Sequence, residues 1–97
     1  MIRQMTALNL DAKRVELDAM FRQASRLVHQ LADIVSDKRS SNVLFDHVEQ
    51  ALAELPLATD EFAFARGRLR NGLSYQRQGE FGAASYELRL LAKNLYS

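Results

Sequence analysis

The sequence contains no cysteine, one proline and four glycines in its 97 residues. The absence of cysteine excludes disulfides, zinc–thiolate sites and catalysis by a thiol. No stretch approaches the roughly 18 uninterrupted apolar residues that a membrane span requires. The amino-terminal residues lack the apolar run of a signal peptide. We therefore expect a soluble, cytoplasmic protein that does not enter a membrane.

The chain also lacks a marked excess of either charge, since 13 Lys and Arg residues face 12 Asp and Glu residues. Dedicated nucleic-acid-binding domains are usually strongly basic, and attraction to a membrane surface needs clustered cations. The hydrophobic fraction of 47% and the charged fraction of 26% are ordinary for a globular protein. The composition predicts a single domain over residues 1–97, with neither nucleic acid nor membrane favoured as its partner.

Helix is the only sustained pattern, because the alternation of apolar and polar residues that marks strands is absent. Asn9 or Asp11 can cap a first helix, Pro56 marks the end of a second, and Gly79 suits the left-handed position that ends a third. A flexible arm is expected at 1–9. The fold predicted is all-α, a small up-down bundle of about four helices over residues 10–37, 42–55, 60–78 and 80–96.

The first of these helices is the longest and carries a continuous apolar seam. Its members follow the alternating spacing of three and four residues that is typical of a coiled coil; they are Leu17, Met20, Ala24, Leu27, Leu31 and Ile34. A helix of this length spans roughly 40 Å, more than any of the others can cover. Since most soluble oligomers are homo-oligomers and dimers are the commonest, we expect a second copy of the chain to cover the rest.

Residues that could carry catalysis or bind a metal are few and dispersed. His29 and His47 lie on different predicted helices, and neither has a carboxylate or histidine at metal-binding spacing. No serine sits in a nucleophile elbow, and the segment GRLRNG lacks the ending of a phosphate-binding loop. We expect both histidines to be surface residues, and we expect no catalytic residue, metal or cofactor.

Three arginines, Arg66, Arg70 and Arg77, fall within about 40° of one another on the third helix. Such a stripe can hold phosphates or the carboxylates of a partner protein. It can equally be a solvated face whose arginine stems cover the edge of the core. Acidic patches nearby can also neutralise it within the fold; their residues are Asp46, Glu49, Glu54, Asp60 and Glu61. The stripe carries the alternative function, a nucleic-acid-associated regulator.

Some apolar residues fall outside the main core-facing stripes. Tyr86 and Leu90 lie one turn apart on the fourth helix, roughly opposite Leu88, and Phe64 and Tyr75 lie off the principal stripe of the third. If the third helix is sandwiched between its neighbours, its second face belongs to the core. Apolar residues clustered on an otherwise polar face are typical of an interaction surface. The predicted protein-binding residues are therefore Tyr86, Leu90, Phe64 and Tyr75.

Residues 65–96 resemble a single tetratricopeptide-type helical hairpin. The small and aromatic residues that match this family's pattern are Gly72, Tyr75, Gly79, Phe81 and Ala84. Other signature positions hold different residues than the family favours: Arg68, Asn71, Leu91 and Tyr96. The resemblance covers one third of the chain and implies a protein-binding module without catalytic activity. Together with the long seam, it predicts a small interaction protein (an adaptor, a chaperone or a regulatory subunit) that self-associates as a dimer.

Overall fold

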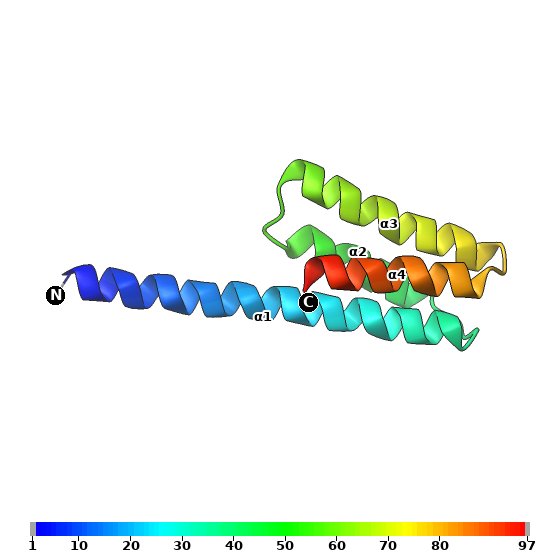
Figure 1. The fold of residues 1–97 in the computed structure, drawn as a ribbon, viewed down its shortest axis with the longest axis horizontal. Helices are drawn as coiled ribbons and strands as arrows, with labels where there is room; N and C mark the ends of the chain where they lie inside the picture. Colours follow the sequence, from blue (N-terminus) through cyan, green and yellow to red (C-terminus); the bar gives the residue numbers. More distant parts are fainter. Residues whose placement is uncertain (1, 97) are drawn as a thin grey trace.

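The computed structural model describes the backbone of residues 2–96 and the side chains of residues 13–96. Successive helices run antiparallel to each other, as the ribbon in Figure 1 shows. The structure thus confirms the expected all-α, up-down bundle. Its elements are α1 (Ile2–Ser36), α2 (Asn42–Glu54), α3 (Thr59–Arg77) and α4 (Phe81–Leu95).

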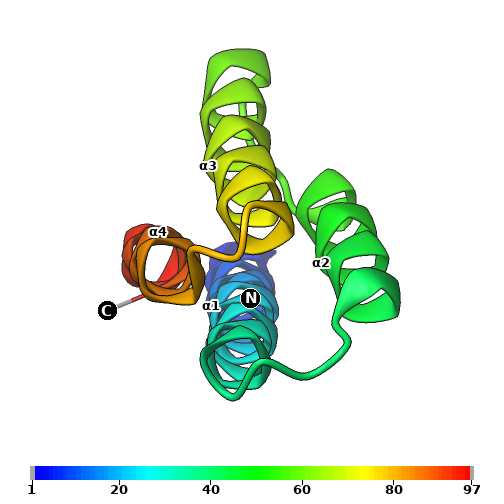
Figure 2. The ribbon, with the colours of Figure 1, turned by 90° about the vertical axis from the view of Figure 1, so that its right-hand side faces the viewer.

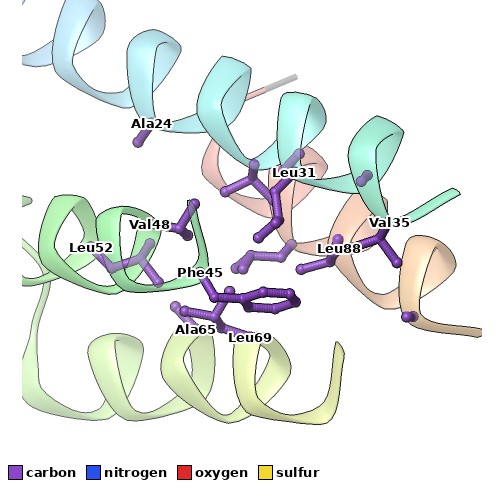
Figure 3. Packing of buried hydrophobic residues seen from close by; sticks show 14 of the residues in the cluster. Ala24, Leu31, Val35, Phe45, Val48, Leu52, Ala65, Leu69 and Leu88 are labelled. Carbon is purple, nitrogen blue, oxygen red and sulfur yellow. The ribbon is translucent and has the colours of Figure 1, made fainter. Parts of the chain in front are cut away.

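The four helices surround one core, which is seen end-on in Figure 2. α4 packs along α1 on one side and α3 on the other, while α2 makes smaller contacts with α1 and α3. Leu31 of α1, Phe45 of α2, Leu69 of α3 and Leu88 of α4 lie together in the centre (Figure 3). Complete burial of one such side chain contributes roughly 1.5–3 kcal/mol. The apolar stripes of all four helices therefore meet within a single chain.

The hairpin between α3 and α4 is closed by glycine. Gly79 has a φ of +79°, which a residue without a Cβ adopts at little cost. The amide of Gly79 donates to the carbonyl of Gln76 at 3.1 Å, and the amide of Glu80 donates to that of Tyr75 at 2.9 Å. These two hydrogen bonds form the Schellman motif, which ends a helix. The expected role of Gly79 is confirmed.

α1 ends in the same motif, although its left-handed residue is a lysine. Lys38 has a φ of +59°, and its amide donates to the carbonyl of Val35 at 3.0 Å. The amide of Arg39 donates to the carbonyl of Ile34 at 3.1 Å. The ammonium of Lys38 lies 5.8 Å from the ring centroid of Phe81, at the start of α4. This contact gives the lysine a tertiary partner at a position that glycine would fill with less strain.

The start of α1 differs from the prediction. The helix begins at Ile2 rather than near Asn9 or Asp11, so residues 2–9 are helical and not a separate arm; Met1 lies outside the described residues. Good cap residues also occur inside helices when the chain before them favours helix. No glycine or proline precedes Asn9, so nothing in the local sequence breaks the helix there.

This early start makes the molecule long and narrow, with extents of 59 × 24 × 21 Å. A helix of the 35 residues of α1 measures about 52 Å, and its first half extends beyond the other three helices (Figure 1). Among the described residues, no helix has both the length and the apolar character needed to cross a membrane.

Candidate functional site

α1 leaves the bundle where α4 ends. The Ser25 hydroxyl, which is buried, donates to the carbonyl of Ala92 at 2.9 Å. One turn earlier, the guanidinium of Arg22 donates to the Tyr96 hydroxyl at 2.9 Å and lies 5.2 Å from the centroid of the same ring. The first part of α1 extends past the other described helices (Figure 1) and joins the bundle at Met20, which lines a groove shared with α2. We call residues 2–20 the projecting segment.

The projecting segment exposes large apolar side chains. Val15 is 70% exposed, Leu17 is 43% exposed and Met20 is 37% exposed. A helix that belongs to a bundle normally turns its apolar residues towards a neighbour, and exposed apolar clusters mark interaction sites. This part of α1 is therefore the first candidate binding surface.

The seam predicted for self-association is divided by the fold. Ala24 and Leu31 are buried, at 5% and 0% exposure, in the core of the same chain. Leu27 is half-buried and packs against that core, and Ile34 is half-buried as well. Ala24, Leu27 and Leu31 thus pack within the bundle, and Leu17 and Met20 are the exposed members of the seam. The seam was predicted from spacing, which does not tell which part of a long helix its own chain covers.

A shallow groove of about 210 Å³ runs between α1 and α2 beside the projecting segment. It begins at Met20, where the segment joins the bundle. The residues that line it are Met20, Gln23, Ala24, Leu27, Ala51, Glu54 and Leu55. The exposed apolar surface of α1 therefore continues onto the bundle instead of ending at its edge.

The outer face of the hairpin formed by α3 and α4 is the second candidate surface. Tyr86 is 65% exposed and Phe64 is 56% exposed, whereas Leu90 and Tyr75 are half-buried. Tyr75 packs against the main core, so its ring serves the fold of the hairpin. Tyr86 and Phe64 are the two predicted binding residues that the structure leaves most accessible.

Arg68 links the two helices of this hairpin. Its guanidinium lies 2.9 Å from the Glu87 carboxylate and 5.0 Å from the centroid of the Phe64 ring. A cation over a ring face is attracted by the ring's quadrupole, so Arg68 orients Phe64 while it pairs with Glu87. No local pattern connects Arg68 with Glu87, which is 19 positions away along the chain.

The arginine stripe lies mostly against α2. Arg66 Nε donates to Glu49 Oε1 at 2.9 Å, and a guanidinium nitrogen of Arg70 lies 3.6 Å from the same oxygen. Arg77 lines a groove of about 480 Å³ between α2 and α3, together with Arg70, Asp46 and Glu49. One carboxylate thus offsets part of the charge of two of the three arginines. This is the neutralisation within the fold that the sequence allowed.

Among residues 13–96, no titratable side chain is fully buried. His29 and His47 are both exposed, and the described residues contain no group of three side chains that could hold a metal ion. The hydrogen bond to Tyr96, and then the charge of Asp18, raise the pKa of Arg22 above its ordinary value. Because arginine is protonated at neutral pH in any case, this shift does not change its charge there.

Sequence reasoning missed two residues of the projecting segment, Val15 and Ala19, which are exposed. A signal for them exists. Apolar residues in the first part of the chain repeat at alternating spacings of three and four: Met5, Leu8, Ala12, Val15 and Ala19. The predicted arm at 1–9 contains Met5 and Leu8, the first two members of this repeat. The prediction of an arm therefore hides the repeat.

No family model, curated protein or solved structure matches the chain. The resemblance of residues 65–96 to a tetratricopeptide-type hairpin therefore stays a prediction. Function must be inferred from the surfaces described above.

Proposed function

We propose that this chain is a small, non-catalytic protein–protein interaction module whose main binding element is the projecting segment of α1. The observation that carries the proposal is the exposure of Val15, Leu17 and Met20 on a part of α1 that extends past the other described helices. Isolated helical stretches are only marginally stable in water, and most helical stability in proteins comes from packing of an apolar face. A second helix lying along the segment would supply that packing.

The role is that of an adaptor, a chaperone or a regulatory subunit. The second helix can come from another copy of the chain, as the predicted homodimer requires, or from a different protein. The outer face of α3 and α4 would provide a second contact through Tyr86 and Phe64, with Leu90 at its margin.

Amide hydrogen exchange of the full chain tests the proposal. In dilute solution, residues 2–20 should exchange much faster than residues 24–35, because no tertiary contact protects them. When the chain associates with itself or with a partner, exchange should slow within residues 2–20. A complex that forms while this segment keeps its fast exchange would show that the binding element lies elsewhere.

The alternative, a nucleic-acid-associated regulator, would use Arg66, Arg70 and Arg77. Glu49 is in contact with two of these arginines, which lowers the positive charge that the stripe presents to phosphates. Phosphate contacts release counterions, so such binding should weaken steeply as salt rises. Absence of DNA or RNA binding at low salt would remove the alternative.

A further inference from the structure

The projecting segment carries an apolar seam of its own. Its members are Met5, Leu8, Ala12, Val15 and Ala19, at the spacing of a coiled-coil seam, within the unbroken helix α1. Val15 lies about 160° around the helix from Leu17. Leu17 is on the side of α1 that faces the core further along the helix. The bundle does not cover the described part of this seam, since the side chains of Val15 and Ala19 are exposed.

The seam ends next to the groove between α1 and α2. The two following seam positions hold arginines, Arg22 and Arg26, and Arg22 is held by Asp18 and Tyr96. One turn after Ala19, however, Gln23 lines the groove, with Glu54 of α2 on its opposite wall. A helix docked on the seam can therefore continue along α2 without a break in its contact surface.

The charges beside the seam are of one sign. With Met5, Ala12 and Ala19 as the first seam position of each heptad, the flanking positions hold Gln4, Asn9, Asp11, Glu16 and Asp18. The charged ones are all acidic. Glu16 is exposed, and Asp18 keeps 48% of its side chain exposed beside Arg22. Glu54 extends the acidic rim into the groove. Flanking charges select the partner and its orientation in a coiled coil.

A second copy of this chain does not suit that rim. In a parallel pair, Asp11 of one copy would face Glu16 of the other on both sides of the seam. In an antiparallel pair, the row of Asp11 and Asp18 would lie beside the same row of its copy. Like charges at these positions oppose association. The basic residues of the segment, Arg3, Lys13 and Arg14, are at positions away from the seam.

We propose that the projecting segment binds an amphipathic helix of a different protein, one that carries lysine or arginine beside its own apolar seam. The inference rests on the proposed function and names the chemistry of the partner. Opposite charges on the two rims would align the helices and speed their encounter, while apolar contact along Val15 and Ala19 would hold them together.

The test uses the full chain and two synthetic helical peptides of about three heptads, both with leucine at the seam positions. One peptide has lysine at the flanking positions and the other has glutamate. By light scattering, the chain alone should be a monomer at tens of micromolar. In fluorescence anisotropy at low salt, the lysine peptide should bind more than about tenfold more tightly than the glutamate peptide. The preference should shrink as salt screens the rims.

Three variants distinguish the contribution of the seam to peptide binding from that of the net charge. Val15→Glu should abolish binding of the lysine peptide without unfolding the bundle, because Val15 is exposed and lies outside it. Glu16→Lys should reduce the preference for lysine at least severalfold. Glu80→Lys, in the turn between α3 and α4, makes the same change in net charge and should leave the preference unaltered.

The outcomes distinguish the two proposals. A dimer of this chain that Val15→Glu dissociates would overturn the partner chemistry and leave the interaction module standing. Equal binding of the two peptides would also overturn the partner chemistry alone. So would an equal loss of the preference for lysine in Glu80→Lys and Glu16→Lys. A chain that stays monomeric and binds neither peptide overturns both proposals.

Discussion

Gly72 on α3 lies directly against Leu88 on α4. A Cβ added at Gly72 would come within 3.1 Å of both the Cγ and the Cδ2 of Leu88, and 3.7 Å from the carbonyl oxygen of Ala84. Leu88 is completely buried, at 0% exposure. The close approach of the two helices therefore depends on the missing side chain at this position.

Gly72→Ala should destabilise the protein despite alanine's higher helix propensity. Moving a buried leucine to accommodate a methyl group costs roughly 1–3 kcal/mol. Gly67→Ala on the same helix is the matched control, since nothing lies within 4 Å of its added Cβ; it should raise stability by about 0.5–1 kcal/mol. Urea unfolding of the two variants checks this. Similar effects in both would contradict the packing of α3 on α4.

Two leucines of α1 should differ in their contribution to stability. Leu31→Ala removes a side chain with 0% exposure from the core and should cost roughly 2–5 kcal/mol in the free energy of unfolding. Leu17→Ala, on the projecting segment, should cost less than about 1 kcal/mol. Thermal and urea unfolding in dilute solution measure both. A large loss for Leu17→Ala would mean that the segment is packed even when the chain is dilute.

The ion pair of Arg68 with Glu87 should be stronger than that of Arg22 with Asp18. Both pairs are 2.9 Å long, but the first has side chains 27% and 20% exposed, against 48% for each member of the second. Double-mutant cycles with alanine should give about 1 kcal/mol of coupling for the first pair and a clearly smaller coupling for the second. Equal couplings would mean that partial burial does not strengthen the link across the hairpin.

Lys38→Gly should stabilise the end of α1. The lysine has a φ of +59°, a conformation that costs a residue with a Cβ roughly 1–2 kcal/mol. Loss of its contact with the Phe81 ring offsets about 0.5 kcal/mol of that gain. We expect a net increase of about 0.5–1 kcal/mol in the free energy of unfolding. Lys38→Ala, which loses the contact and keeps the strain, is the control and should lower stability.

Much of the fold could be predicted from the sequence because its signals are local. Pro56 and Gly79 end helices in any surrounding, and the spacing of Ala65, Leu69 and Gly72 identifies the buried face of α3 whatever packs on it. The start of α1 could not be found in this way. Asn9 and Asp11 favour a helix start but do not force one, and the residues before them are compatible with helix.

The candidate site was harder to predict than the fold. The seam through Ala24 and Leu31 has the spacing of a coiled coil, and a core helix has the same spacing. The part of the seam that stays exposed depends on where α2 and α4 end along α1, which is a feature of the tertiary structure. The exposure of Tyr86 followed from its position opposite Leu88, whereas the packing of Tyr75 depended on how α4 lies beside α3.

The continuity of α1 also affects how quickly a partner can be captured. Starting a helix is the unfavourable step, because several residues must be fixed before the first hydrogen bond forms, whereas extending one is easy. In this chain, residues 21–36 are already helical within the bundle and offer a finished end from which residues 2–20 can grow. The bundle thus serves as the nucleus for the projecting helix, so that a partner needs only to stabilise its extension.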